Sequence, residues 1–367
     1  SFQELSSFIN ENPDWPLINH LKKNAESAMS NDLKPGVILN WFGKRDPLTT
    51  VGWMHKIKAY LEIGEVKKAR KIIKNVWINK NFVRHNEKYF YKLYRRHLTI
   101  KDHEQRLDRL LWEGKNWPVR RMLWKVNSSF RLVSEARLML RQNLGNVDKA
   151  ISKVSNDQIN SPGLIFERLR WRIRKGKYEE SIELLSSAPK NPIYPKKWWR
   201  ERSYLTRLAL KKGHITRAYQ LAKKHSLKEG AEFAEAEWLA GWISLRFLKE
   251  PKIALKHFNN MYHKVNYPIS RARGAYWSGR AEFAMGNINK ANNWFQTASK
   301  QPTAFYGQLA LAWLNLNEPN TLPPEPNLVA EEISEFQKLE LVKVIEILSA
   351  INNHDAIKHF LLAIADI

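Results

Sequence analysis

The sequence predicts an all-α protein built as a solenoid of paired helices, and three observations lead to this fold class. The chain has 367 residues, more than a single hydrophobic core usually holds, so a stacked array of units is expected. It contains only 15 Gly and 16 Pro and no bounded run of alternating β-branched residues, which argues against an all-β fold. The third observation is helical periodicity joined by a recurring turn.

The clearest helix pair is expected within residues 271–310. Its first half steps by four, three and four through Ala272, Tyr276, Gly279 and Phe283. Its second half steps by three, four and three through Ile288, Ala291, Phe295 and Ala298. Each set of steps traces one face of an α-helix, and Gly286-Asn287 between them tolerates the left-handed conformation that ends a helix. A single hairpin cannot cover both of its apolar sides, so it needs neighbours like itself.

The same turn recurs as a glycine followed five residues later by a small residue. It is found at Gly64/Ala69, Gly145/Ala150, Gly176/Ser181, Gly213/Ala218 and Gly286/Ala291, with Lys249/Ala254 as a variant without the glycine. The last five of these anchors are 31, 37, 36 and 37 residues apart. Such spacings are typical of TPR-like helix hairpins stacked into a superhelical solenoid, which we expect to curve into a ring or horseshoe. The unevenness indicates a degenerate array.

Prolines divide the chain at both ends of this array. The first 50 residues contain Pro13, Pro16, Pro35 and Pro47, so their helices are expected to be short and interrupted. Four prolines in the segment NEPNTLPPEP end the array. We therefore expect a superhelical domain over residues 1–318, a Pro-rich linker over 319–327, and the start of a further helical domain over 328–367.

The formal charge of +25 at pH 7 is unevenly distributed. Residues 167–224 contain 17 Lys and Arg against 5 Asp and Glu, and residues 80–125 contain 13 against 5. Residues 318–367 reverse the balance with 3 against 9, a net of −6, so the body before them carries +31. A basic body favours anionic partners such as nucleic acid, an anionic membrane surface or a polymer that bears carboxylates.

Two segments interleave tryptophans with arginines and supply the candidate binding residues. The first contains Arg168, Arg170, Trp171, Arg172 and Arg174, and the second contains Trp198, Trp199, Arg200 and Arg202. Planar rings beside guanidinium groups suit sugars, carboxylates held by two hydrogen bonds, or single-stranded nucleic acid. The alternative interpretation is that the tryptophans pack between helices and the arginines form a solvated outer face.

No catalytic, cofactor or metal site is predicted. The patterns GxxxxGK, GxGxxG and GxSxG are absent. The closest histidine pairs, His257/His263 and His354/His359, do not have the spacing of a helical metal site. The sequence contains no cysteine, which excludes disulfides and thiolate chemistry. No apolar run approaches the ~18 residues that a membrane-spanning helix needs, and no signal peptide is expected.

Several long segments resemble the helical region of soluble lytic murein transglycosylases. The longest covers residues 234–310 and begins AEAEWLAGWISLRF. It is preceded, in the family's order, by NPDWP near the start, LDRLLWEGK at 107–115, SPGLIFERLRWRIRKG at 161–176 and WWRERSYLTRLAL at 198–210, and together these cover most of residues 10–310. The resemblance implies an α-superhelical ring domain of a periplasmic enzyme. Such enzymes cleave the β-1,4 bond between N-acetylmuramic acid and N-acetylglucosamine to a 1,6-anhydro product. It also implies peptidoglycan glycan strands and stem peptides as partners, and a lysozyme-like catalytic domain in the same chain.

The resemblance transfers no catalytic residue to this sequence. The family's catalytic Glu precedes a Ser and is followed by a Gly-Leu-Met-Gln-type segment. Glu-Ser is found here only at Glu26-Ser27 and Glu180-Ser181, and neither is followed by a similar segment. We therefore expect the non-catalytic superhelical portion, inactive alone, which binds murein through a basic surface and positions a catalytic domain.

Two other functions are weighed against this one. A TPR-like scaffold would bind protein partners without an enzymatic role, but the uneven spacing and the charge argue against it. A helical-repeat RNA binder is permitted by the basic charge. Repeat readers of RNA use one regular unit per base, however, and the spacings of 31 to 37 residues do not keep such a register, so no nucleic-acid partner is expected.

Overall fold

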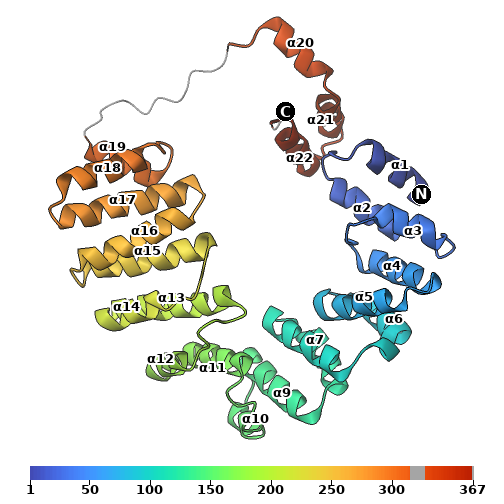
Figure 1. Ribbon diagram of the computed structural model, residues 1–367, viewed down its shortest axis with the longest axis horizontal. Helices are drawn as coiled ribbons and strands as arrows, with labels where there is room; N and C mark the ends of the chain where they lie inside the picture. Colours follow the sequence, from blue (N-terminus) through green and yellow to red (C-terminus); the bar gives the residue numbers. More distant parts are fainter. Residues whose placement is uncertain (315–326, 366–367) are drawn as a thin grey trace. The chain divides into compact units, whose positions relative to one another are not determined.

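The computed structural model describes residues 1–314 and 327–365, which form an all-α solenoid (Figure 1). Over these residues, 22 α-helices and two short 3-10 helices supply the regular secondary structure. The predicted fold class is confirmed, whereas the ring or horseshoe curvature stays a prediction. None of the helices in these ranges is long and apolar enough to cross a membrane.

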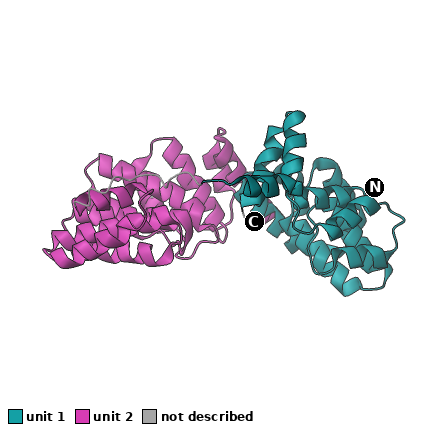
Figure 2. Ribbon diagram, turned by 90° about the horizontal axis from the view of Figure 1, so that it is seen from above, with its two compact units in different colours: residues 1–127, 323–367 teal, residues 128–322 magenta. Residues whose placement is uncertain are grey.

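The chain packs into two compact units (Figure 2). The first comprises residues 1–127 and 323–367, and the second comprises residues 128–322. The expected division into residues 1–318, 319–327 and 328–367 stays a prediction. Residues 319–326 of the expected linker lie outside the described residues.

The first unit contains two groups of helices. The amino-terminal group is α1 (Phe2–Glu11), α2 (Ile18–Ser27), α3 (Pro35–Phe42), α4 (Thr50–Glu62), α5 (Val66–Asn79), α6 (Arg84–Tyr94), η1 (Arg95–His97), α7 (Ile100–Glu113), α8 (Asn116–Met122) and η2 (Leu123–Lys125). The carboxyl-terminal group is α20 (Ala330–Lys338), α21 (Glu340–Ala350) and α22 (His354–Ala365). Within this unit the rings of Trp15 and Phe360 meet edge to face, with their centroids 5.9 Å apart.

The second unit is an uninterrupted series of helices in two layers. Its members are α9 (Ser128–Gln142), α10 (Val147–Ser152), α11 (Pro162–Arg174), α12 (Tyr178–Ser186), α13 (Pro195–Lys211), α14 (Ile215–Lys223), α15 (Gly230–Arg246), α16 (Pro251–Lys264), α17 (Pro268–Ala284), α18 (Ile288–Ser299) and α19 (Phe305–Trp313). Helices α10 and α11 both pack on α9, and from α11 onward each helix packs on the next along the chain. Because α11, α13, α15, α17 and α19 also contact one another in that order, they form one layer of the unit.

Two hairpins of this unit close through the same contact between a glycine and a phenylalanine. A Cβ atom on Gly241 of α15 would lie 2.6 Å from the Phe258 ring of α16, and a Cβ atom on Gly279 of α17 would lie 2.7 Å from the Phe295 ring of α18. Both rings are fully buried. Any larger residue at either glycine would collide with the ring.

The recurring turn places one residue in the left-handed conformation. Lys249, the variant without glycine, adopts it with a φ of +58°. At the turn assigned to Gly145, however, two asparagines adopt it, Asn143 with a φ of +54° and Asn146 with a φ of +59°, and Gly145 does not. Asparagine tolerates this conformation because its short amide can hydrogen-bond locally, so the turn forms there without a left-handed glycine. Gly114, with a φ of +78°, supplies a further turn that the spacing pattern missed.

Candidate binding surfaces

The candidate binding residues lie on two neighbouring helices of one layer, α11 and α13. Trp198 and Trp199 of α13 are only 3% and 1% exposed, and Arg202 is also buried. These three side chains are enclosed in the fold, and ligand binding by them stays a prediction. The alternative interpretation, in which the rings pack between helices, holds at these positions.

The burial of the two tryptophans follows from their neighbours in the layer. The Trp198 ring meets the Phe166 ring of α11 edge to face at 5.1 Å. The indole Nε1 of Trp199 donates a hydrogen bond of 3.0 Å to Oε2 of Glu235 on α15. Burial also lowers the pKa of Arg202 to about 10. This part of α13 therefore serves helix packing.

Several arginines of the candidate set are committed to protein partners. Arg170 lies 3.3 Å from a carboxylate oxygen of Glu201 and 3.7 Å from one of Glu167. Arg172 and Arg174 donate hydrogen bonds of 2.6 Å and 2.5 Å to backbone carbonyl oxygens. Arg168, Arg170, Trp171 and Arg172 are half-buried, while Arg174 and Arg200 are exposed. Glycan binding by these six residues stays a prediction.

Glu237, a buried glutamate in the same unit, is surrounded by hydrogen-bond donors. Glu237 accepts from His257 at 2.5 Å, from Asn260 at 2.7 Å and from His225 at 3.1 Å. Burial alone would raise the pKa of Glu237, but the hydrogen bonds and charges of the two histidines outweigh it and lower the pKa to about 2. Glu237 therefore stays ionised and holds two helices together.

Glu26, one of the two glutamates that precede a serine, is also fully buried and saturated. Its carboxylate accepts hydrogen bonds from the backbone of Leu48 at 2.8 Å and from the backbone and hydroxyl of Thr49 at 2.7 Å and 2.6 Å. A Cβ atom on Gly52 would collide with this carboxylate at 2.4 Å. Glu26 thus holds the start of α4 in place, and its neighbours leave no space beside its carboxylate for a substrate.

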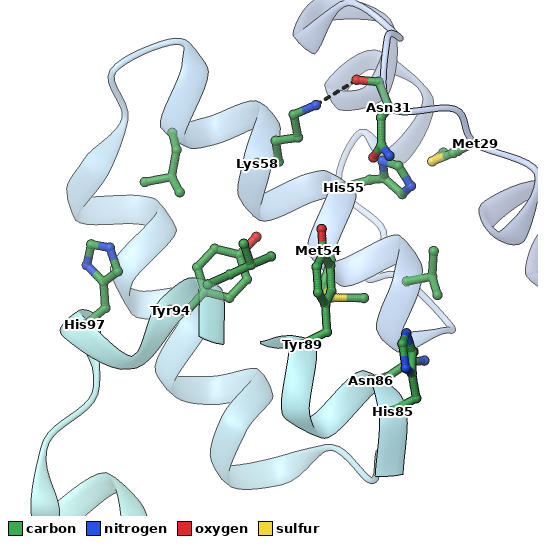
Figure 3. A pocket seen from close by; sticks show the side chains of 13 residues that line it. Met29, Asn31, Met54, His55, Lys58, His85, Asn86, Tyr89, Tyr94 and His97 are labelled. Atoms are coloured by element: carbon green, nitrogen blue, oxygen red, sulfur yellow. Dashed lines mark hydrogen bonds between the residues drawn. The ribbon is translucent and has the colours of Figure 1, made fainter. Parts of the chain in front are cut away.

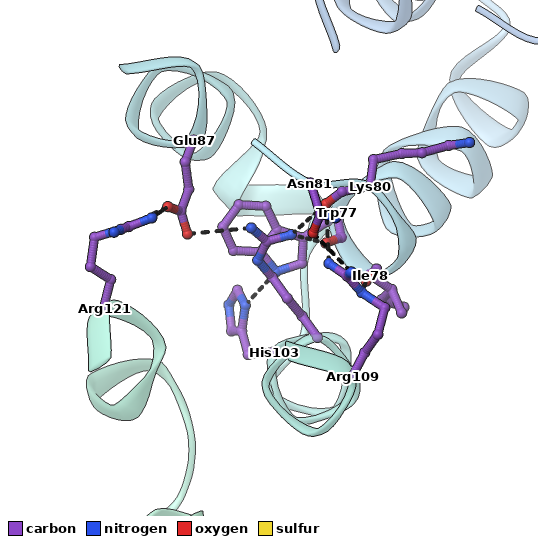
Figure 4. A network of polar contacts seen from close by, with 9 residues as sticks. Trp77, Ile78, Lys80, Asn81, Glu87, His103, Arg109 and Arg121 are labelled. Carbon is purple, nitrogen blue, oxygen red and sulfur yellow. Dashed lines mark hydrogen bonds and ion pairs between the residues drawn. The ribbon is translucent and has the colours of Figure 1, made fainter. Parts of the chain in front are cut away.

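A polar network in the first unit joins α5, α6, α7 and α8 (Figure 4). The Glu87 carboxylate accepts from Nη2 of Arg106 at 3.3 Å and from Nε of Arg121 at 2.8 Å, with a second bond from Arg121. Arg106 is buried, its guanidinium lies 4.3 Å from the Trp77 ring centroid, and burial lowers its pKa to about 10. The indole of Trp77 donates to Nδ1 of His103 at 3.0 Å. The network therefore fixes the orientation of Arg121.

Beside this network lies a hollow of about 630 Å³ that sequence reasoning missed. It is lined by Arg84, Trp117, Arg120, Arg121 and Trp124, and we call it the aromatic–arginine hollow. Its two tryptophans are 76% and 79% exposed. The Arg120 guanidinium lies 6.0 Å from the Trp117 ring centroid, and Arg121 is the residue that Glu87 holds.

A pattern in the sequence could have revealed this hollow. Arg120, Arg121 and Trp124 lie three, four and seven positions after Trp117, which places all four on one side of a helical segment. Such a stripe is usually interpreted as a buried face. Here α8 ends at Met122 and continues as η2, and the stripe faces solvent. The charge excess of residues 80–125 was recognised, but its aromatic partners were not.

The first unit also contains a larger pocket, of about 770 Å³, between α4 and α6 (Figure 3). Its lining includes His55, His85, His97, Lys58 and Tyr94 and no acidic residue. Burial lowers the pKa of His55 and raises the pKa of Tyr94 to about 12. Lys58 donates a 2.6 Å hydrogen bond to the Asn31 carbonyl oxygen. Across the part of the chain that the structure describes, no group of three or more His, Cys, Asp or Glu residues could hold a metal ion.

Comparisons with known proteins place the fold. The structure is similar to that of the lytic transglycosylase Slt from Pseudomonas aeruginosa, solved as an inactive mutant, with a TM-score of 0.65 and 16% identity over 100% of this chain and 58% of that one. It is also similar to the 70-kDa soluble lytic transglycosylase in complex with bulgecin A, with a TM-score of 0.56 and 12% identity over 99% of this chain and 57% of that one. No protein-family model matches the sequence, and no curated protein matches it significantly.

These structural similarities show the fold alone. The chain spans less than two thirds of each lytic transglycosylase, and the low identity transfers no residue by itself. The solenoid architecture implied by the family resemblance is confirmed.

Proposed function

We propose that this chain is the non-catalytic superhelical portion of a periplasmic peptidoglycan lytic transglycosylase. It binds murein through its basic surface and positions a catalytic domain that this sequence does not contain. That domain would cleave the bond between N-acetylmuramic acid and N-acetylglucosamine and leave a 1,6-anhydro end. The catalytic activity belongs to the whole protein, whereas this portion supplies binding and placement.

The structural likeness carries the proposal. Two lytic transglycosylases share the fold over essentially the whole of this chain, although the chain accounts for less than two thirds of each of them. A shared fold permits many functions. The sequence resemblance over residues 10–310 points to the same group of enzymes independently of the coordinates, and the two lines of support agree.

The charge distribution gives a physical basis for binding. The chain carries a formal charge of +25, and murein stem peptides carry free carboxylates that lysine and arginine can meet. Each exposed contact is weak, but many contacts to one polymer add through multivalency. Because such contacts lie at the surface, salt screens them over about 10 Å at 0.1 M ionic strength. Binding should therefore depend strongly on salt.

Pelleting with purified sacculi tests the binding half of the proposal. The chain is incubated with sacculi at low and moderate salt, and the bound fraction is measured after centrifugation. We expect binding that falls as salt rises, and weaker binding to sacculi whose carboxylates have been amidated. An absence of salt-sensitive pelleting would remove this half of the proposal.

The catalytic half is tested by product analysis. We expect the chain alone to release no 1,6-anhydro muropeptides, because Glu26 is enclosed by its hydrogen-bond donors and Glu180 precedes a buried serine in a helix turn. Release of anhydro products, detected by mass spectrometry, would show that the chain contains an active site. Selective capture of a protein partner without binding to sacculi would instead favour a scaffold.

A further inference from the structure

We propose that the aromatic–arginine hollow is a peptidoglycan subsite. The indoles of Trp117 and Trp124 would take up sugar rings, and the arginines around them would bind stem-peptide carboxylates. This inference rests on the proposed function and goes beyond it, because it assigns binding to one place in the first unit. The set of residues differs entirely from the Arg168–Arg202 candidates.

The exposure of the two indoles is the first argument. Tryptophan is among the most buried residue types on average, and clustered exposed apolar surface marks interaction sites. Buried places for indoles exist close by, since Trp77 of α5 and Trp112 of α7 lie in the interior. Trp117 and Trp124 stay at the surface around one hollow. Their exposure therefore indicates a binding role.

The spacing of the two rings is the second argument. Seven helical positions separate them, which corresponds to roughly 10 Å along the helix axis, a length on the scale of a disaccharide. Arg120 and Arg121 lie between them in the sequence, so the flat apolar surfaces alternate with positive charge. A polymer of sugar rings that bears carboxylates on short side branches has a matching alternation.

The arginines form the third argument. Glu87 holds Arg121 through two hydrogen bonds, and the Arg121 side chain still keeps 33% of its surface exposed. Arg84 is exposed and forms no ion pair with any residue in 1–314 or 327–365. The lining has three guanidinium groups and no acid of its own. Planar guanidinium groups bind carboxylates by paired hydrogen bonds, so an anionic ligand fits better than a neutral one.

The competing ligand of the same chemistry is single-stranded nucleic acid, whose bases stack on aromatic rings and whose phosphates attract arginine. The fold likeness to lytic transglycosylases favours peptidoglycan. Both ligands therefore enter the experiment.

The experiment measures binding of soluble, uncrosslinked glycan strands that retain their stem peptides to the full chain, by isothermal titration calorimetry. We expect the double substitution W117A/W124A to weaken binding at least about tenfold, as loss of exposed aromatic anchors does elsewhere. W117F/W124F should keep most of the affinity because it keeps flat rings. The control is Y267A, which removes an equally exposed ring, 77% exposed, from the second unit. Circular dichroism and thermal melting confirm that each variant folds.

A second comparison separates the rings from the charges. R84A should weaken binding to strands with free stem-peptide carboxylates but leave unchanged the binding to strands whose carboxylates have been amidated. W117A/W124A should weaken both. Equal effects of R84A on both strands would overturn the assignment of carboxylates to the arginines.

The outcomes distinguish this inference from the function on which it rests. If the wild-type chain binds sacculi and W117A/W124A binds them equally well, the subsite is wrong and the proposed function stands. If the wild-type chain binds neither sacculi nor soluble strands, both fail. If it binds a single-stranded oligonucleotide more tightly than glycan and W117A/W124A abolishes that binding, the hollow is a nucleic-acid site and the glycan assignment is overturned.

Discussion

The segments 116–125 and 195–211 both place two tryptophans beside arginines, and the two pairs of indoles lie in opposite environments. Trp117 and Trp124 are among the most exposed large side chains of the described residues, whereas Trp198 and Trp199 are buried. The local composition is nearly the same. The difference must therefore come from the surroundings of each helix.

The neighbours of the two helices account for the difference. Helix α13 lies within a layer and is contacted by α11, α12, α14 and α15, so its tryptophans meet partners on several sides. Helix α8 is short and packs chiefly on α7 and η2. Position in the array decides whether a tryptophan supports the fold or stays available to a ligand. Four predictions test this comparison.

The largest expected effect is on stability at the buried pair. Trp199→Ala should lower the free energy of unfolding by about 3–5 kcal/mol, because it leaves a cavity and deprives Glu235 of a donor. Trp117→Ala should change it by less than about 0.5 kcal/mol. Urea titration followed by circular dichroism measures both. Similar losses would show that the two environments do not differ in the way described.

A slightly smaller loss is expected when the network beside the hollow is broken. Glu87→Gln leaves Arg106 buried without its carboxylate and should cost about 3 kcal/mol. Glu201→Gln in the second unit should cost less, since its partner Arg170 is partly exposed and retains Glu167. The same urea titration gives both values. Glu87→Gln should also weaken glycan binding, because Arg121 loses the carboxylate that orients it. Unchanged glycan binding would show that the polar network does not contribute to binding at the aromatic–arginine hollow.

Acidification should weaken the two units over different pH ranges. In the first unit, burial and then the Lys125 charge lower the pKa of His103 to about 4 from 6.5. Folding therefore favours neutral His103, and this contribution to stability is present above pH 6.5 and lost as the pH falls to about 4. In the second unit the ionised Glu237 loses its contribution only between pH 4.5 and about 2.

Thermal melting between pH 7 and pH 3 measures the order in which the two units lose stability. Fluorescence and hydrogen exchange are read separately for each unit. The control His103→Gln should flatten the pH dependence of the first unit between pH 6.5 and 4. Earlier weakening of the second unit would contradict the assignment.

The smallest stability effect is expected at the rim of the hollow. Arg84→Ala should change the free energy of unfolding by less than about 0.5 kcal/mol, since Arg84 lies at the surface. Arg121→Ala should cost about 1 kcal/mol, because it removes two hydrogen bonds from a half-buried pair. Both substitutions should weaken glycan binding. A loss of stability without a loss of binding at Arg121 would make that residue purely structural.

The helix pairs could be predicted from sequence because their signals are local. Gly286 and the face through Gly279 and Phe295 lie within a few turns of one another, and the turn at Lys249 was recognised even without a glycine. At the turn assigned to Gly145 the left-handed residues are Asn143 and Asn146 instead of the glycine, since asparagine also tolerates this conformation.

The binding surfaces could not be predicted in the same way because burial depends on distant residues. Trp199 meets Glu235, and Glu87 meets Arg106 and Arg121, over 36, 19 and 34 residues of sequence. No short pattern contains both partners. The stripe at Trp117 and Trp124 has the period of a core face, and only the exposure of the two side chains in the fold shows otherwise.

The glycine–phenylalanine contacts of α15–α16 and α17–α18 have a consequence for how such a chain can evolve. Each hairpin contains both residues of its own contact, Gly241 with Phe258 and Gly279 with Phe295. A duplicated copy of either hairpin would therefore keep the packing register of its two helices. Its helix ends could then lengthen or shorten without disturbing the glycine–phenylalanine contact. Inheritance of this kind would produce successive units whose lengths drift, as the spacings of 31, 37, 36 and 37 residues between the recurring turns do.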